Sequence, residues 1–409
     1  MSGKIYHAAV IGAGASGMAA ACALAERGMY TALVEKNHRL GRKILSTGAG
    51  KCNFSNENIS LNDYICQEKN ILKRIFSKIP PQKVLDFFSK RLKMLCSKDS
   101  DGKLYPFSRK AETVVFAMEN FIKSSSVDIM TLREAISVKW NNGFFEIELC
   151  SSPGPGERKS MSASVTTIRC ANLILACGGP SYPRIGGTYS GFELARCFGH
   201  TVRPLSPLIT SFEVANPDLS ILDGLRLQAR AFLPDGSDIE GELLFTSYGI
   251  SGPLALDLSF LYARNCFEKI SLDLLPEFSK KELISFFKPA SGTYLNTLRS
   301  SLDDKLVSFI LSISKIRPDS FTDTGGLNII ISLLKNIPLH GLSPSGFEQA
   351  MAKTGGVPLC EVDDCFESIK RKGLFLTGEM LDCGGRSGGY NLHFAWTSGL
   401  LAGMSIRKD

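Results

Sequence analysis

Three glycines near the start of the chain have the spacing of a phosphate-binding turn. Gly12, Gly14 and Gly17 form a GxGxxG pattern directly after a short apolar run. In such a turn the first glycine permits a tight bend, the second lets backbone N–H groups reach a pyrophosphate, and the third lets a helix pack closely on a strand. The phosphates then lie at a helix N-terminus, where unpaired N–H groups favour negative charge. The pattern therefore predicts a dinucleotide-binding turn.

An acidic residue closes the next apolar run. Glu35 ends the segment TALVE at 31–35, after an Ala-rich stretch of high helical propensity. An acid at this place accepts hydrogen bonds from adenosine ribose hydroxyls and disfavours a 2′-phosphate. The same glycines could shape an unrelated loop, but here strand, helix and acid follow one another in register. This segment predicts a bound dinucleotide without separating FAD from NAD.

A second glycine-rich segment occupies residues 373–403. A strand ends at Thr377–Gly378, Glu379 follows, and a glycine turn leads into a helix expected from about Asn391. In flavoproteins an acid at such a strand end binds the ribityl chain. The positive end of the following helix stabilises the anion that forms on the flavin pyrimidine ring during reduction. The alternative interpretation is that these glycines only shape a turn.

The elements that must position these residues can be read from hydrophobic periodicity. The first 35 residues form a strand–helix–strand unit. Further on, the sequence predicts the following elements: a helix at Val114–Ile122, a hairpin from Ile136–Val138 and Phe144–Leu149 around NNG, a turn-rich loop at 151–160, and a buried strand at Asn172–Ala176.

The middle of the chain has a different pattern of hydrophobic and polar residues. From about Thr201, Pro-punctuated alternating segments predict antiparallel β structure, and residues near 277–335 carry helical spacing. The last sixty or so residues return to strand and turn character before the terminal helix. We therefore expect the first and last parts to form one α/β domain, with an insertion between them.

Bulk composition agrees with a globular chain of more than one structural unit. The 409 residues are 44% hydrophobic and 21% charged, with a formal net charge of +7. The most basic segments, 69–78 and 83–98, are read as solvated helix faces in preference to a polyanion site. The apolar stretch 8–25 is interrupted by glycines, so no membrane span or export signal is expected and the default compartment is the cytoplasm.

The twelve cysteines are expected to be mostly reduced thiols. They are scattered through apolar runs of a long chain, unlike the dense framework of a small secreted domain. Cys360 and Cys365 are the closest pair, but their spacing is not that of a CxxC motif, and no second pair completes a zinc site. No metal is therefore expected.

Several blocks together resemble one known family, the BaiN/RdsA-type NAD(P)/FAD-dependent oxidoreductases, also called aminoacetone-oxidase-like flavoproteins. The blocks are VIGAGASGMAAA near the start, GRKILSTGAGKCNFSN at 41–56, LACGGPSYPRIGGT, GELLFTSYGISGP at 241–253, and GEMLDCGGRSGGYNLHFAWTSGLLAG near the end. They span nearly the whole chain in the expected order. The resemblance implies three parts: an FAD-binding Rossmann-like domain at 1–199 and 345–409, a β-barrel-like insert at 200–275 and 325–344, and a small helical insert at 276–324.

The resemblance also implies which residues bind FAD. They are Gly12, Gly14, Ala15, Ser16, Gly17, Glu35, Lys36, Arg42, Lys43, Gly48, Gly50, Cys52, Asn53, Gly378, Glu379, Gly388, Gly389, Tyr390 and Asn391. Arg42 and Lys43 fit this set because cations balance the charge of the phosphates and the flavin edge. Ordinary surface cations are the alternative for both.

The sequence departs from the family pattern at three places. Lys51 stands where arginine is usual. The planar guanidinium group, which can bind an anion through two parallel hydrogen bonds, is thus replaced by a compact ammonium group. Ser247 replaces a histidine in FTSYGISGP, so an acid or base that this histidine supplies in relatives is missing here. The usual aspartate–glycine–proline–threonine reads Gly384–Ser387, where Arg386 either adds positive charge near the flavin or faces solvent.

A flavin exchanges hydride at N5, so the protein mainly positions substrate and tunes charge. No catalytic residue is assigned: Tyr248, Tyr390 and Cys52 are candidate proton donors, each expected more as a structural residue, and His393 is expected on a helix face. No second GxGxxG follows a strand, so NAD(P)H is expected as a transient reductant.

We expect an oxidoreductase acting on a small organic molecule; a flavin-dependent RNA-modifying enzyme and a flavin-binding sensor or interaction protein are the alternatives. The oligomeric state is left open.

Overall fold

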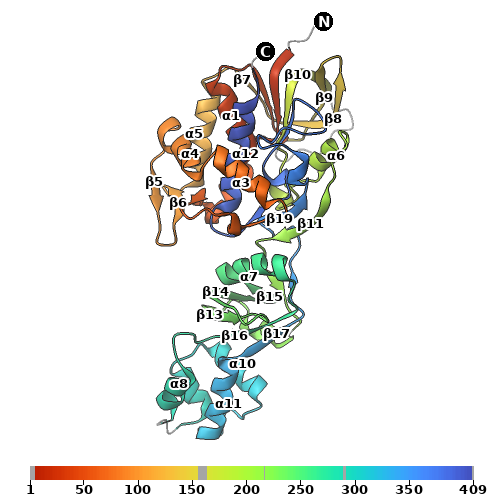
Figure 1. Ribbon diagram of the computed structural model, residues 1–409. Coiled ribbons are helices and arrows are strands. Elements are labelled where there is room, and N and C mark those ends of the chain that lie inside the picture. Colours follow the sequence, from red (N-terminus) through yellow and green to blue (C-terminus); the bar gives the residue numbers. More distant parts are fainter. Residues whose placement is uncertain (1–4, 155–163, 216, 289–291, 408–409) are drawn as a thin grey trace. The chain divides into compact units, whose positions relative to one another are not determined.

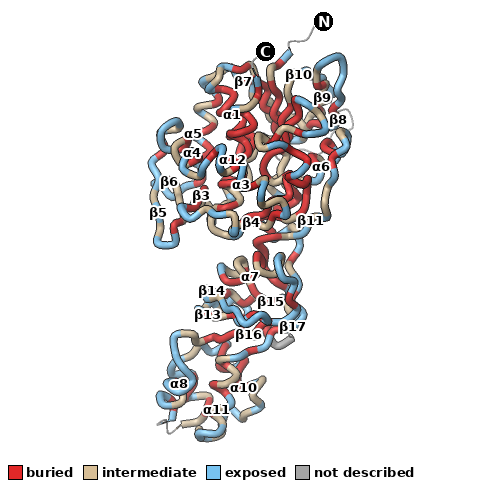
Figure 2. The backbone as a smooth tube through the Cα atoms, in the orientation of Figure 1, coloured by how far each residue is buried: buried red, intermediate tan, exposed pale blue. Residues whose placement is uncertain are grey.

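A computed structural model describes residues 5–154, 164–215, 217–288 and 292–407. The chain divides into two compact units: the first contains Met1–Pro207 and Met351–Asp409, and the second contains Leu208–Ala350. Each unit has its own buried hydrophobic cluster. Figure 2 shows that burial in the first unit concentrates on its central strands and on the helices α1 and α12.

The first unit is built on a mixed sheet. Its strands, in spatial order, are β7 (Val127–Met130), β2 (Thr31–Val34), β1 (Ile5–Ile11), β10 (Val165–Leu175), β9 (Phe144–Ser151) and β8 (Arg133–Asn141), and β20 (Leu374–Leu376) also pairs with β10. Strands β7, β2, β1, β10 and β20 are parallel to their neighbours in this set, which is the arrangement of a Rossmann-type domain. Parallel strands need both faces covered, and β2 is accordingly buried throughout.

The expected hairpin and buried strand are both present. β8 and β9 pair antiparallel, with Asn142 at φ 50° and Gly143 at φ 86° in the turn. Two positive φ values in succession are what a tight turn between twisted strands requires. The expected strand at Asn172–Ala176 forms most of the parallel half of β10. Residues 155–160 of the expected turn-rich loop lie outside the described residues.

Helices α1 (Ala15–Glu26) and α12 (Tyr390–Ser405) come from opposite ends of the chain and pack side by side, red and blue in Figure 1. Their backbones approach so closely that a Cβ atom on Gly399 would lie 2.1 Å from the Ser16 carbonyl oxygen. Every residue of α1 from Ser16 to Ala25 is buried, as expected of an Ala-rich helix packed between a sheet and a second helix.

Smaller elements complete the first unit. Its remaining helices are α2 (Arg42–Ser46), α3 (Lys69–Lys78), α4 (Pro81–Asp86), α5 (Ala111–Lys123) and α6 (Ser190–Arg196). Three small sheets are formed by β3 (Ser55–Asn56) with β6 (Lys103–Pro106) and β5 (Cys96–Lys98), by β4 (Tyr64–Ile65) with β21 (Gly384–Gly385), and by β11 (Arg203–Leu208) with β19 (Ala352–Gly356). The expected helix at Val114–Ile122 lies within α5, and all twelve cysteines are free thiols.

The second unit contains an antiparallel sheet, as its alternating segments predict. The strand order is β17 (Ile337–His340), β16 (Lys269–Asp273), β13 (Arg226–Phe232), β14 (Asp238–Thr246), β15 (Gly249–Ser251), β12 (Phe212–Glu213) and β18 (Ser343–Pro344). Within the described residues the outer strands β17 and β18 do not pair with each other, so no closed barrel is found. The barrel-like expectation is corrected to an open sheet, because closure requires its two edges to meet.

Helices account for the rest of the second unit. Helix α7 (Gly252–Asn265) packs on β14, and the expected helical segment near 277–335 contains α8 (Lys280–Phe287), α9 (Tyr294–Arg299), α10 (Asp304–Ser314) and α11 (Thr324–Leu334). Each of these four helices starts at a side chain that caps its backbone N–H groups, and the caps are Ser279, Thr293, Asp303 and Asp323.

Adding one methyl group at Gly399 should destabilise the first unit. Alanine gains about 1 kcal/mol of helix propensity over glycine, whereas overpacking a close contact costs about 1–3 kcal/mol. Because the added Cβ would meet backbone at 2.1 Å, we expect the contact to dominate. Gly399→Ala should therefore lower the urea midpoint of unfolding. Met404→Ala, at an exposed position of the same helix, is the control and should leave it within error. Equal midpoints for both variants would contradict the packing.

Candidate functional site

The glycine turn between β1 and α1 has one open glycine and two packed ones. A Cβ on Gly12 would lie 2.5 Å from the Ala176 carbonyl oxygen, and one on Gly17 would lie 1.8 Å from the Gly12 carbonyl oxygen. A Cβ on Gly14, the N-cap of α1, would meet nothing within 4 Å. At Gly12 and Gly17 the strand, the turn and the helix thus pack closely. At Gly14, by contrast, the side on which a Cβ would lie is open, and this side is at the N-terminus of α1.

Glu35 lies directly after β2 and is bound to this turn. Its Oε2 accepts a hydrogen bond from the Ala13 N–H at 2.8 Å, and its Oε1 accepts one from the Asn37 N–H at 2.9 Å. Arg42 donates to Asn37 Oδ1 at 2.7 Å, so this cation belongs to the same network. Glu35 is nearly fully buried. The expected ribose-binding acid is therefore held beside the expected phosphate-binding turn.

Lys43 and Glu379 form an ion pair between the start and the end of the chain. Lys43 Nζ lies 2.7 Å from Glu379 Oε2, and Ser181 donates to Glu379 Oε1 at 3.0 Å. The Gly179 N–H also donates to this carboxylate, at 3.2 Å. Burial opposes the ionisation of Glu379, but the charge of Lys43 and these hydrogen bonds outweigh it and hold the pKa of Glu379 below its ordinary value. Glu379 is therefore an anion at neutral pH.

A buried lysine that belongs to no recognised sequence motif lies near this pair. Lys353 is 2% exposed, and its Nζ donates to the carbonyl oxygens of Gly355 and, at 2.8 Å, Leu381. Burial lowers the pKa of Lys353 to about 8, although the nearby charge of Glu379 acts in the opposite direction. Lys353 therefore adds a second positive charge near Glu379 below pH 8.

The third cluster surrounds the N-terminus of α12. The helix begins at Tyr390, and a Cβ on Gly389 would lie 2.5 Å from the Ser55 carbonyl oxygen and 2.8 Å from Asn53 Oδ1. Asn53 Oδ1 is buried, and no hydrogen-bond partner for it exists in the part of the chain that the structure describes. Such an oxygen costs free energy unless a donor reaches it. Asn391 instead uses its side chain to bind both backbone groups of Gly385, at 2.8 and 2.7 Å.

All of the expected residues lie in the first unit, and contacts link several of them. Ser16, at the start of α1, lies close to Gly378, where an added Cβ would be 2.5 Å from Ser16 Oγ. The backbone before α2 is bound to the glycine turn through Gly41 N–H and the Ala13 carbonyl oxygen, at 2.8 Å. Gly48 and Cys52 both have left-handed backbone, and Cys52 directly precedes Asn53. Residues that sequence reasoning missed are Asn37, Gly179, Ser181 and Lys353; the first three follow strand ends, which is a usable signal.

The positions that depart from the family pattern have plain structural settings. Lys51 and Ser247 are exposed. Arg386 lies over the ring of Tyr390 at 5.9 Å and pairs with Asp63 at 3.7 Å, with its side chain 44% exposed. The charge of Arg386 is thus shared between solvent and a carboxylate.

The three candidate proton donors lie in different environments. Cys52 is fully buried, and burial raises the pKa of its thiol to about 12. Tyr390 is buried and packs against Tyr64, with ring centroids 6.2 Å apart. Tyr248, in the second unit, is 40% exposed and donates to Gln349 at 2.9 Å. Cys52 and Tyr390 are thus buried, whereas Tyr248 is exposed and belongs to the second unit.

A Ser–His–Glu arrangement elsewhere in the first unit is structural. His200 Nε2 lies 2.8 Å from Ser368 Oγ, and His200 Nδ1 lies 2.8 Å from Glu361 Oε2, which resembles an acyl-transfer triad. However, Ser368 Oγ also accepts from the N–H groups of Lys370 and Arg371, at 3.1 and 3.0 Å, and the serine is buried. The Ser368 oxygen is therefore occupied by hydrogen bonds that stabilise a turn, and it is not available as a nucleophile.

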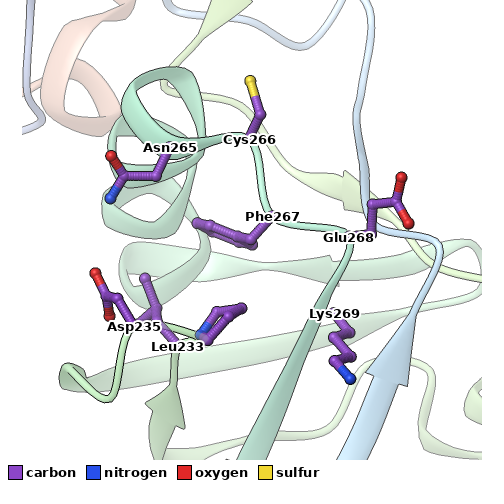
Figure 3. Close-up of a pocket in the computed structure, with 8 residues that line it drawn as sticks. Leu233, Asp235, Asn265, Cys266, Phe267, Glu268 and Lys269 are labelled. Carbon is purple, nitrogen blue, oxygen red and sulfur yellow. The ribbon is translucent and has the colours of Figure 1, made fainter.

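A hollow of about 510 Å³ lies in the second unit, at the turn after β13 and the start of β16. Figure 3 shows the Phe267 ring between the end of α7 at Asn265 and the turn that carries Asp235. None of its lining residues belongs to the clusters described above, and we assign it no part of the cofactor site. Within the described ranges, no group of three or more His, Cys, Asp or Glu could hold a metal ion, and no helix is long and apolar enough to cross a membrane.

Comparison with known proteins identifies the family. The model of the HI0933-like protein Rossmann domain matches residues 6–405. The chain belongs to this family. The 3-dehydro-bile acid delta(4,6)-reductase of Clostridium scindens is 31% identical over 418 residues, which cover 98% of each chain. The ribosomal RNA dihydrouridine synthase of Escherichia coli is 26% identical over 404 residues, which cover 96% of each chain.

Solved structures agree on the fold. The 3-ketosteroid-delta4-(5alpha)-dehydrogenase from Rhodococcus jostii RHA1 aligns with a TM-score of 0.52 at 13% identity, covering 100% of this chain and 98% of that chain. The BaiN/RdsA-type resemblance and the α/β class with a Rossmann-type domain are confirmed, and the HI0933-like chain is a flavin-dependent oxidoreductase. The open edge of Gly14 and the unpartnered Asn53 oxygen beside α12 fit FAD as the cofactor of this family.

Gly14→Val should remove FAD without unfolding the protein. Gly14 has φ −80° and ψ −164°, an extended conformation that valine adopts, and its Cβ direction is open. The side chain would then block the approach of a phosphate to the backbone. We expect a colourless protein with the circular dichroism spectrum of the parent chain. Lys51→Val, at an exposed position of the nearby loop, is the matched control and should purify yellow. A Gly14→Val protein that retains stoichiometric FAD would contradict the placement.

Buried His393 should make stability depend on pH. Burial lowers the pKa of His393 from 6.5 to about 4, and its Nδ1 lies 2.8 Å from Ser55 Oγ. Between these values the unfolded chain binds a proton that the folded chain does not, so stability falls as the pH is lowered from 6.5 to 4. The loss over this window amounts to roughly 3 kcal/mol. Urea unfolding of His393→Asn should show a flatter dependence on pH, whereas exposed His38→Asn should match the parent.

Proposed function

We propose that this HI0933-like chain reduces a carbon–carbon double bond conjugated to a carbonyl group in a small organic molecule, with NAD(P)H as the reductant. FAD, when bound, supplies N5 as the atom that accepts and donates hydride. The proposal rests on what two relatives of nearly full coverage are named for. One is a reductase of a 3-dehydro-bile acid at the 4,6 positions, and the other makes dihydrouridine in ribosomal RNA.

Both names describe the same type of bond. A 4,6-diene in a 3-oxo steroid is conjugated to the 3-carbonyl, and the double bond that uridine loses on becoming dihydrouridine is conjugated to a ring carbonyl. In each case hydride adds to the carbon remote from the carbonyl, and a proton adds to the carbon next to it. The negative charge that develops meanwhile rests on the carbonyl oxygen, where hydrogen-bond donors stabilise it.

The residues of this chain that would hold the cofactor follow from the three clusters. The open edge at Gly14 and the N-terminus of α1 would bind the pyrophosphate, and Glu35 would bind the adenosine ribose. Glu379, kept ionised by Lys43, would accept hydrogen bonds from the ribityl hydroxyls. The N-terminus of α12 at Tyr390 would favour negative charge on the flavin ring. The remaining members of the predicted set, including Lys36 and Gly50, are proposed to line the same site.

The test follows the flavin spectrum without oxygen. The purified chain with FAD should bleach on addition of NADH or NADPH, and the reduced protein should regain its absorption when an enone acceptor such as a 3-oxo-4,6-diene bile acid is added. The matching saturated 3-oxo bile acid is the control and should leave the spectrum bleached. Bleached flavin that none of a panel of enones reoxidises would contradict the proposed reaction. Flavin that bleaches with dithionite but with neither nicotinamide would contradict the proposed donor.

Ribosomal RNA is a second candidate substrate. Relatives in Escherichia coli and Haemophilus influenzae, each 26% identical, are named ribosomal RNA dihydrouridine synthases. The net charge of +7 agrees in sign, but Arg74 and Lys78 in the basic helix α3 already pair with Asp364. Formation of dihydrouridine in added ribosomal RNA, with binding that weakens steeply as salt is raised, would select this candidate over the small molecule.

A further inference from the structure

Two cysteines that the proposed reaction does not use lie opposite each other where β4 pairs with β21. The antiparallel register pairs Gly384 with Ile65 and Gly385 with Tyr64. In the same antiparallel register the N–H of Arg386 donates to the carbonyl oxygen of Asp63 at 2.9 Å. When the same register is extended by one residue in the other direction, Cys383 falls opposite Cys66. The two residues come from distant parts of the sequence, so only the folded chain places them together.

The alternation of an antiparallel ladder defines how this pair meets. Arg386 and Asp63 form a hydrogen-bonded pair, so the pairs along the register alternate and Cys383 with Cys66 occupies a non-hydrogen-bonded position. In such a position the Cα atoms are roughly 4.5 Å apart and the side chains lie on one face, which is within the range that a disulfide needs. The two thiols are in hydrogen-bond contact with each other, and both are buried.

The two sulfur atoms differ in their electrostatic environment. The hydrogen bond from Cys383 lowers the pKa of the Cys66 thiol, burial acts in the opposite direction, and the N–H of Glu68 donates to the same sulfur. Burial raises the pKa of Cys383. Buried cysteines elsewhere in the described chain, such as Cys22 and Cys170, have their pKa raised by burial. The carboxylates of Glu68 and Asp382 act against ionisation of Cys66, but the net pKa shift of its thiol is downward. We therefore assign the attacking role to Cys66 and the resolving role to Cys383.

We propose that Cys66 and Cys383 form a dithiol site that hydrogen peroxide oxidises to a reversible disulfide. The Cys66 thiolate attacks one peroxide oxygen, the O–O bond breaks, and the departing hydroxide takes up a proton as water, leaving a sulfenic acid. The Cys383 sulfur then attacks the Cys66 sulfur, the S–O bond breaks, and hydroxide leaves with the Cys383 proton as a second water. Two thiols lose two electrons and one peroxide gains them. Peroxide suits this site because the two residues are only 8% and 5% exposed, which excludes bulkier oxidants.

The location of the site gives the disulfide a structural role. Asp382, beside Cys383, accepts from Arg203 at 2.9 Å and from the Gly355 N–H at 2.8 Å. On the other side, Gly385 is bound by Asn391 at the start of α12. The new bond would fix β4 covalently to the segment that leads into this helix.

The experiment maps cysteine linkages in the full chain with FAD bound. The protein is treated with hydrogen peroxide, denatured in N-ethylmaleimide so that every remaining thiol is captured, digested without reduction, and analysed by mass spectrometry. We expect a peptide pair joined through Cys66 and Cys383 that dithiothreitol separates. Cys383→Ser should stop at a sulfenic acid on Cys66, which dimedone traps. Cys22→Ser is the matched control at a buried cysteine and should still form the linked pair.

Two results would overturn the proposal. One is recovery of both cysteines as maleimide adducts at a peroxide dose that oxidises exposed Cys197. The other is linkage of Cys66 or Cys383 to a different cysteine in the folded protein. The map of the parent chain decides both points, so the result stands even if Cys383→Ser fails to fold. The flavin absorption recorded before and after treatment confirms that the mapped protein is folded.

Discussion

The structure depends on one contact, the close packing of α1 against α12. At Gly399 this packing leaves no room for a Cβ atom, and the carbonyl oxygen it would meet belongs to Ser16 in the first turn of α1. Because the two helices are fixed at this distance, the N-terminal glycine turn and the C-terminal glycine turn lie in one unit. A dinucleotide site divided between distant parts of the sequence requires such a contact. Without this contact, the two glycine turns for which we propose phosphate binding and flavin-ring binding would not be held at a fixed distance.

The charged residues of this site also come from distant parts of the sequence. Lys43 follows the first turn, Glu379 precedes the last helix, and Lys353 approaches from the strand β19. A carboxylate that is partly removed from water is costly unless it is paired and hydrogen-bonded, and Glu379 has two cations and two hydrogen-bond donors near it. The cluster therefore contributes to cohesion of the unit, in addition to the cofactor binding that we propose for it. We therefore expect the effects of substitutions within this cluster on stability to be non-additive.

Much of the fold could be predicted from local sequence. The turn at Gly12–Gly17, the hairpin closed by Asn142 and Gly143, and the helix that begins at Tyr390 all depend on short-range patterns of glycine and hydrophobicity. What the sequence could not give depends on distant pairing. The barrel-like expectation was wrong because closure depends on whether two edge strands meet. The burial of Lys353 was missed because its desolvation comes from residues far along the chain, and the Asn391 side chain proved to bind backbone.

The strands β11 and β19 mark where the chain leaves and re-enters the first unit, and they pair with each other. The exit and return points of the 208–350 segment are therefore tied together within the first unit. Because β11 and β19 pair within the first unit, the strands of this unit stay connected in the same way whatever the inserted segment contains. The second unit could thus diverge, or be exchanged for another, at little cost to the domain that carries the redox group. In such an architecture, evolution can change the inserted unit separately from the domain that contains the Rossmann-type sheet.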